Sequence, residues 1–408
     1  MLCDRVSNSF LKEAINNMSL NLYSGRFLVL ATLAFFLVFS SVFESNASED
    51  IKHYVFVPNR GSADIAVIDS RIDRVIKRIE VGEVPHQVAV SLELGKIAVT
   101  NTADDTVSII DSSTFMVVAN VPLDSEPEHI AMNHTGDTIA VGNIGAGTVS
   151  LVSLVSAQEI SRVQGLFEPH NMTFSSNGKY LYVGNLGSNF VSVINVASGV
   201  VIDEIPVGNN KKIGSFNANK DEYQGIINIT STTDGKLGFA AYGEDDRMAV
   251  IDLDSQSVIK NIELGDLPWR AFATADGKYM LIPNNGDRTV SIISTKSLDE
   301  VARVAGGADM TGISTGWFDT LAYVISRGED KAIVIDLTSM QKVGEVDLPS
   351  SPETGVITPD GRKLYVALSG SNKVAVIDVK AMKIDKMIGG VGEEPWGAHM
   401  VGAINYCH

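Results

Sequence analysis

The sequence is nearly free of cysteine. Only Cys3 and Cys407 occur among 408 residues, so one chain cannot build a disulfide framework or a cysteine-based zinc or iron–sulfur site. The ending Tyr406-Cys407-His408 lacks the first cysteine of the C-x-x-C-H motif that attaches haem covalently. An attached cytochrome domain with a built-in second haem is therefore excluded.

Basic residues and helical patterns are also scarce. The 32 Lys and Arg residues are outnumbered by 49 Asp and Glu residues, which gives a net charge of −17. A field of this sign repels phosphate backbones and anionic lipid surfaces, so we do not expect nucleic acid as a partner. No stretch after residue 47 shows a sustained helical period of apolar residues, which argues against an α-helical domain.

One long apolar run lies near the N-terminus. Residues 27–43 carry no charge, follow Arg26 and precede a segment of small residues. This layout predicts a signal peptide comprising residues 1–47, with residues 48–408 as a single periplasmic or extracellular domain. An uncleaved membrane anchor is the alternative, because the run reaches the short limit for spanning a bilayer. We expect cleavage, and hence no stable membrane anchor.

The rest of the sequence repeats one unit eight times. Each unit has a short β-branched strand, a Gly/Asn/Asp turn, an alternating strand and a third strand, and a fourth strand follows a proline. Four strands in about 42 residues are typical of a β-propeller blade. The units begin at Tyr54, Ile97, Ile139, Leu181, Gly238, Met280, Ala322 and Leu364.

Strand counting predicts how the ring closes. The three strands between Tyr54 and Val81 lack an inner partner, and the C-terminal segment AHMVGAINYC supplies one. Pairing the two chain ends removes the free sheet edges that otherwise aggregate. We therefore expect an all-β, eight-bladed propeller of four-stranded antiparallel blades, present as a monomer. A seven-bladed ring is the alternative if one unit is degenerate.

The amino-acid sequence of the units resembles a known repeat family. The segments YV-[TG]-N, V-x-V-I-D and P-x-x-V-A-x-S-x-D-G-K resemble the YVTN family of propeller repeats from Tyr54 to about Tyr406. An eight-bladed, exported, cysteine-poor propeller is also similar to the noncovalent-haem propeller of periplasmic cytochrome nitrite reductases and to related haem-maturation proteins. The resemblance is specific for fold and weak for function. It adds noncovalent haem to the candidate cofactors.

Four of the seven histidines gather in neighbouring units. His86, His129 and His170 follow the repeated proline, and His399 lies on the closing segment. Propellers place these positions at one mouth of the central channel, where clustered imidazoles favour copper or zinc, or serve a haem. A polar channel mouth without a ligand is the competing interpretation. Repeat duplication copies harmless histidines, and His129 is one position out of register with His86 and His170.

A second set of candidate residues surrounds the same mouth. Trp269, Arg270, Glu353 and Trp396 also follow repeated prolines. An arginine beside aromatic rings suits a carboxylate or a planar ligand, so we predict a cofactor-binding role for these four residues. The alternative is that both tryptophans pack as wedges between blades.

Three functions remain open from the sequence. The first is a non-enzymatic exported scaffold that binds a small ligand, a cofactor or a partner protein at the channel mouth. The second is a redox or cofactor-handling protein that uses the histidines to hold copper, zinc or noncovalent haem. The third, a lactonase-like hydrolase, lacks a dedicated base. The G-x-S-x-G motif at residues 312–316 falls in an inner strand without a following helix, which rules out a nucleophile elbow.

Overall fold

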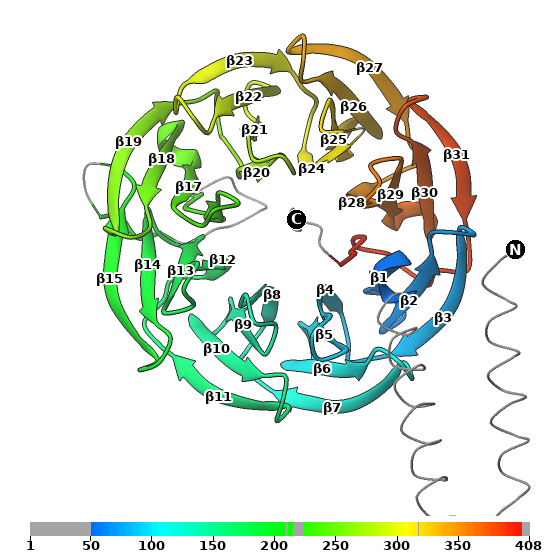
Figure 1. Ribbon diagram of the computed structural model, residues 1–408, viewed down its shortest axis with the longest axis horizontal. Helices are drawn as coiled ribbons and strands as arrows, with labels where there is room; N and C mark the ends of the chain where they lie inside the picture. Colours follow the sequence, from blue (N-terminus) through cyan, green and yellow to red (C-terminus); the bar gives the residue numbers. More distant parts are fainter. Residues whose placement is uncertain (1–49, 209–210, 215–223, 317, 402–408) are drawn as a thin grey trace, which may run out of the picture. The chain divides into compact units, whose positions relative to one another are not determined.

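The chain forms a ring of eight antiparallel sheets, the blades, around a central axis (Figure 1). The computed structural model describes residues 50–208, 211–214, 224–316 and 318–401. The predicted signal peptide, residues 1–47, lies outside the described residues. The described residues belong to one compact unit. None of its described helices is long and apolar enough to cross a membrane.

The first half of the ring holds blades 1 to 4, each numbered along the chain. Blade 1 contains β1 (Tyr54–Asn59), β2 (Asp64–Asp69) and β3 (Arg74–Glu80). Blade 2 contains β4 (Pro85–Ser91), β5 (Lys96–Asn101), β6 (Thr106–Asp111) and β7 (Met116–Pro122). Blade 3 contains β8 (Pro127–Met132), β9 (Thr138–Asn143), β10 (Thr148–Ser153) and β11 (Gln158–Val163). Blade 4 contains β12 (Pro169–Phe174), β13 (Tyr180–Asn185), β14 (Phe190–Asn195) and β15 (Val200–Pro206).

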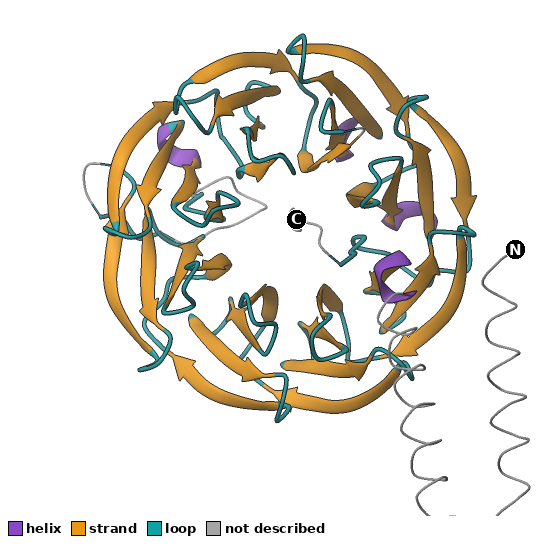
Figure 2. Cartoon of the chain, viewed as in Figure 1, coloured by secondary structure: helices purple, strands orange, loops and turns teal. Residues whose placement is uncertain are grey.

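The second half holds blades 5 to 8. Blade 5 contains β16 (Thr230–Ser231), β17 (Leu237–Tyr242), β18 (Arg247–Asp252) and β19 (Ser257–Glu263). Blade 6 contains β20 (Phe272–Ala273), β21 (Tyr279–Asn284), β22 (Thr289–Ser294) and β23 (Glu300–Ala305). Blade 7 contains β24 (Met310–Gly316), β25 (Leu321–Ser326), β26 (Lys331–Asp336) and β27 (Gln341–Asp347). Blade 8 contains β28 (Pro352–Ile357), β29 (Lys363–Leu368), β30 (Lys373–Asp378) and β31 (Lys383–Ile388). Short 3-10 turns complete the described structure: η1 (Ile51–His53), η2 (Gly243–Asp245), η3 (Arg327–Glu329) and η4 (Ser369–Ser371) (Figure 2).

The burial pattern explains the order of strands within a blade. The middle strands are packed on both faces, so β2 (DIAVID) is buried along its whole length. The outermost strands have one face in solvent, and β7 alternates exposed and half-buried residues up to the buried Val121. Continuous β-branched and aliphatic runs favour the first environment, and alternation favours the second. The sequence therefore specifies which strands lie in the middle of a blade and which form the rim.

The hydrophobic core lies between blades. One cluster joins Phe56, Ile65 and Val67 of blade 1 to Val88 and Ile97 of blade 2. Equivalent clusters occur at the other blade boundaries within the described chain. Because each blade buries its faces only against its neighbours, the ring must close to complete the core.

Closure occurs between the two ends of the chain, which confirms the prediction of eight blades. Residues 393–399 run antiparallel to β1 and form the inner strand of blade 1. Phe56 and His399 exchange two backbone hydrogen bonds, of 2.8 and 2.9 Å, and the Trp396 amide donates to the Pro58 carbonyl at 2.9 Å. Of the predicted closing segment, residues 402–407 lie outside the described residues. The seven-bladed alternative is wrong.

The innermost strands differ from the prediction in one respect. The sequence pattern places the start of these strands after the repeated proline, but β4, β8, β12 and β28 begin at the proline itself. Proline suits the first residue of an edge strand, because no ladder hydrogen bond needs its missing N–H. The register then shifts within the next residues, between Pro85 and Val88 in β4 and between Pro169 and Met172 in β12. This bulge turns two successive side chains out of the regular ladder and into the channel region.

Candidate functional site

The bulges create two rings of equivalent residues, which we call the first and second channel positions. They are the two residues that follow the proline or its equivalent in each blade, as the strand registers define it. The first channel position is occupied by Trp396, His86, Glu128, His170, Ile227, Trp269, Thr311 and Glu353, in blade order. The second is occupied by Gly397, Gln87, His129, Asn171, Asn228, Arg270, Gly312 and Thr354. The second position is thus polar or glycine in every blade, although it sits in a buried part of the fold.

Three of the predicted histidines meet on blades 2, 3 and 4. The Nε2 atoms of His129 and His170 lie 2.8 Å apart, and their ring centroids are separated by 3.8 Å. The ring of His86 stands edge-on to that of His129 at 5.1 Å. All three side chains are buried, with His129 only 1% exposed. The difference in register did not keep them apart, because the bulge presents both channel positions to the neighbouring blade.

Hydrogen bonds fix the orientation of two of these rings. The Nδ1 atom of His170 donates to the Ile227 carbonyl at 3.0 Å. The Nδ1 atom of His129 faces the Gln87 Oε1 atom at 3.3 Å. That atom must be oxygen, because it accepts the Ile130 amide proton at 2.7 Å. Both Nδ1 atoms are therefore donors, and both Nε2 atoms direct lone pairs towards each other.

Two facing lone pairs at this separation require a positive species between them. A proton shared by the two rings satisfies the contact, and so does a metal ion bound to both Nε2 atoms. Burial and, secondarily, the charge of Arg270 lower the pKa of His170 to about 3, so this imidazole is neutral and its Nε2 lone pair is available. Histidines that ligate metals characteristically donate the other ring N–H to a carbonyl or carboxylate oxygen. His129 and His170 both have that arrangement.

Glu128 completes the cluster with an oxygen ligand. Its Oε2 atom lies 3.7 Å from His129 Nε2, and its Oε1 atom lies 3.9 Å from His86 Nδ1. Ligand atoms of His86, Glu128 and His129 all fall within 4.8 Å of one another. Burial raises the pKa of Glu128 to about 7, against the opposing charge of Arg60. A cation beside this carboxylate would favour its ionised form.

The spacing of the His86, Glu128 and His129 ligand atoms is compatible with one ion. Metal–nitrogen bonds of about 2.0–2.1 Å place the ligands of a tetrahedral site about 3.3 Å apart. The observed separations of 2.8, 3.7 and 3.9 Å fall on both sides of that value. Small rotations of the side chains adjust the contacts of His129 to that value. His170 contacts His129 but lies outside the group of ligand atoms within 4.8 Å of one another, so its ring must move further to share an ion with His86 and Glu128.

His399 is placed differently from the other three histidines. It lies three residues beyond Trp396, and its backbone pairs with Phe56 in the closing strand. It does not belong to the group of His86, Glu128 and His129 ligand atoms found among the described residues. Burial lowers the pKa of His399 to about 3. Its predicted role as a fourth histidine ligand stays a prediction.

The second predicted set is distributed around the ring. The Arg60 guanidinium carbon lies 4.1 Å from the centroid of the Trp396 ring. The Trp396 ring stands edge-on to the His86 ring, with 6.2 Å between the centroids, so it covers one side of the histidine cluster. Glu353 is buried on blade 8, where Arg327 donates to it at 3.0 Å and Ser369 donates to its other oxygen.

The remaining two members lie on blade 6. The amide of Trp269 donates to the Pro283 carbonyl, and its side chain is half-buried. The buried guanidinium of Arg270 packs over Phe272 at 4.5 Å. The four residues predicted for cofactor binding therefore occupy blades 1, 6 and 8, each with neighbours of its own.

Sequence reasoning missed four polar residues that matter for the geometry. Gln87, Glu128, Asn171 and Asn228 occupy channel positions and are buried or half-buried. Aligning the repeats at the proline places the first three in the same columns as the histidines, and this was the available signal. Asn228 escapes that alignment because blade 5 has Ile226 in place of the proline.

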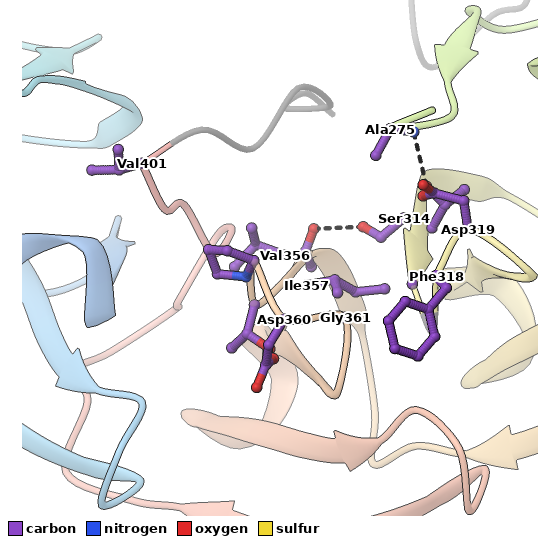
Figure 3. A pocket seen from close by; sticks show the side chains of 14 residues that line it. Ala275, Ser314, Phe318, Asp319, Val356, Ile357, Asp360, Gly361 and Val401 are labelled. Atoms are coloured by element: carbon purple, nitrogen blue, oxygen red, sulfur yellow. Dashed lines mark hydrogen bonds between the residues drawn. The ribbon is translucent and has the colours of Figure 1, made fainter. Parts of the chain in front are cut away.

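A second region of the channel contains the G-x-S-x-G motif. Ser314 lies in β24 beside a cavity of about 480 Å³ between blades 7 and 8, and Phe318 stands at its rim (Figure 3). The Ser314 hydroxyl donates to the Gly355 carbonyl at 3.1 Å (Figure 3). A serine held by the adjacent strand, without a helix after it, is not an activated nucleophile.

Comparison with known structures places the fold among propellers of several kinds. Hydrazine synthase of Kuenenia stuttgartiensis is 22% identical, with a TM-score of 0.56, over 72% of this chain and 95% of that one. Dihydro-heme d1 dehydrogenase NirN, solved with DHE, is 16% identical, with a TM-score of 0.68, over 86% and 76%. A functionally unknown protein of Desulfotomaculum acetoxidans is 14% identical, with a TM-score of 0.59, over 85% and 98%.

These identities establish a common fold, and the resemblance to haem-related propellers holds at that level. No curated protein matches the sequence. A family match covers residues 89–404, from the inner strand of blade 2 to the closing segment. The chain therefore belongs to the YNCE-like beta-propeller family.

Proposed function

We propose that this propeller is a non-enzymatic binding protein for one divalent transition-metal ion, copper or zinc. The ion is held by Nε2 of His129 and His170, with His86 and Glu128 completing the site. The observation that carries the proposal is the pair of Nε2 atoms 2.8 Å apart, each on a ring whose Nδ1 faces a carbonyl oxygen. Imidazole with a carboxylate is a ligand set that suits zinc and copper.

The surroundings support a buried cation. The protein has a net charge of −17, which raises the local concentration of cations. Trp396, packed beneath Arg60, shields one side of the cluster from solvent. Thr100 ties the two blades together, because its hydroxyl accepts the Gln87 amide at 3.1 Å and donates to the Glu128 carbonyl at 2.7 Å. The ligands on blades 2 and 3 therefore project from strands that are hydrogen-bonded to each other.

A tetrapyrrole is the second candidate, since NirN is described in complex with DHE. Its fit to the residues is poorer. A flat macrocycle between His129 and His170 would have to separate Nε2 atoms that now lie 2.8 Å apart, and it would displace the Gln87 and Ile227 contacts that orient the rings. The geometry favours an ion over a macrocycle.

Metal titration of the purified residues 48–408, stripped with a chelator, tests the proposal. We expect one copper or zinc ion per chain by elemental analysis and calorimetry. His129→Ala and His170→Ala should each weaken binding by roughly 100-fold or more, beyond the effect of losing an outer-shell partner. His134→Ala is the matched control, because that histidine is exposed in a turn, and it should bind like the parent.

Two results would overturn the proposal. One is a parent that binds neither metal better than the His129→Ala variant. The other is haem uptake that depends on these histidines in a protein with no metal affinity, which would favour the tetrapyrrole. The proposed export is tested separately, by sequencing the N-terminus of the protein isolated from its native host for cleavage after residue 47.

A further inference from the structure

A second polar cavity lies beside the histidine cluster. It has a volume of about 390 Å³ and is lined by residues of blades 2 to 6, among them Gln87, Asn171, Asn228 and Arg270. These four are consecutive members of the second channel position, apart from His129. The volume is at the lower end of the range for small-molecule sites.

The cavity contains a buried positive charge. Arg270 is only 4% exposed, and burial lowers the pKa of its guanidinium to about 9, which still leaves it charged at neutral pH. Its charge is close enough to His170 to lower the pKa of that imidazole. A guanidinium presents several N–H donors in one plane and matches the two oxygens of a carboxylate.

Two amide side chains add a donor and an acceptor. Asn171 is 9% exposed, and its Nδ2 atom has no hydrogen-bond acceptor among the residues that the structure describes. Asn228 is 2% exposed, and within the same part of the chain its Oδ1 atom has no donor. The Nδ2 atom of Asn228 is used, since it donates to the Thr230 hydroxyl at 2.6 Å. That hydroxyl gives its own hydrogen to the Ala271 carbonyl at 2.7 Å and can only accept from Asn228, which fixes the side of the amide that is oxygen. Buried polar atoms are rarely left unsatisfied, so these two are available to a bound ligand or an ordered water.

We propose that this cavity binds a small hydroxycarboxylate. The carboxylate lies against Arg270 and the Asn171 amide, and the hydroxyl donates to Asn228 Oδ1. A hydroxyl fits that acceptor better than an ammonium group does, because an ammonium would lie close to the guanidinium charge. The site is independent of the proposed metal ion, since none of its three ligand-binding side chains is a metal ligand.

Calorimetry on the chelator-treated protein tests this inference apart from the metal site. The probes are racemic lactate, propionate, alanine and sulfate, each at the same ionic strength. Lactate should bind at one site per chain. Propionate should bind about tenfold more weakly, because it leaves Asn228 Oδ1 without a donor. Alanine and sulfate should bind more weakly still.

Variants locate the binding. Arg270→Gln should reduce lactate affinity by about 10- to 100-fold, the range for losing a charged hydrogen-bond partner, and Asn171→Ala by about tenfold. Arg288→Gln on the same blade is the control, because that side chain is 64% exposed and pairs with Glu329. Unfolding curves monitor each variant, and Asn171→Ala decides the matter if Arg270→Gln does not fold.

Three outcomes would overturn the inference. The first is a folded parent protein that does not bind lactate. The second is binding of propionate or sulfate that is as tight as the binding of lactate. The third is lactate binding that is unchanged in both Arg270→Gln and Asn171→Ala.

Discussion

Removing the closing strand should unfold the propeller. Deleting residues 394–408 removes four backbone hydrogen bonds to blade 1, each worth about 1 kcal/mol net. It also removes Met400, which is 2% exposed in a cluster with Val55, Val57 and Tyr365 and contributes about 2–3 kcal/mol by burial. The total, about 7 kcal/mol, is comparable with the whole stability of a typical domain. It also leaves β1 as an unpaired edge.

A point variant gives the graded version of this prediction. Met400→Ala should lower the free energy of unfolding by about 2–5 kcal/mol, measured by urea denaturation with circular dichroism. Met116→Ala is the matched control, because that side chain is 65% exposed, and it should change stability by at most about 0.5 kcal/mol. A truncated protein with the parent's unfolding curve would refute the closure argument, and so would equal effects of the two methionine variants.

Three further predictions concern the channel and the closing seam. Gln87→Met should weaken metal binding about 10- to 100-fold, because it removes the oxygen that faces His129 Nδ1. Gln87→Glu keeps an acceptor there and should retain most of the affinity. Equal metal affinities of the two variants would contradict the role of Gln87 as the acceptor for His129. Burial lowers the pKa of His399 in the folded protein to about 3, below its value in the unfolded chain, so its contribution to the free energy of unfolding is present above pH 6.5 and is lost at about 1.4 kcal/mol per pH unit as the pH falls towards 3. His399→Gln should therefore reduce the slope of stability against pH in this range, and an unchanged slope would contradict the prediction. Tyr365→Phe should cost about 1.5–3 kcal/mol in urea denaturation, because the hydroxyl donates to Asp73 across the seam between blades 8 and 1, and an unaltered midpoint would show that water replaces the bond.

Most of the fold could be predicted from the sequence because the repeat supplies the same information eight times. The strand order, the eighth blade and the closure follow from the 42-residue period and the missing inner strand before Tyr54. The exact start of the inner strands could not be predicted. A bulge of one residue after Pro85 or Pro169 leaves no mark in an alternating pattern, since proline also reads as a turn.

The candidate site was predictable in part. The sequence placed His86, His129 and His170 at one mouth, and the structure brings them together. The sequence could not show which ring nitrogen faces which neighbour. For His170 this depends on the backbone carbonyl of Ile227, which lies in an inner segment without the repeated proline. The acceptor for His129 is Gln87, which occupies the equivalent position in the preceding blade. The two side chains meet because the inner strands of adjacent blades pack side by side.

The most direct test of the central claim is an anomalous-diffraction map of crystals of the mature protein grown with zinc or copper. We predict one strong peak about 2.0–2.1 Å from both His129 Nε2 and His170 Nε2, with the two nitrogens moved apart from their present 2.8 Å. An ordered ion elsewhere, or no peak and an unchanged direct contact between the two nitrogens, would contradict it.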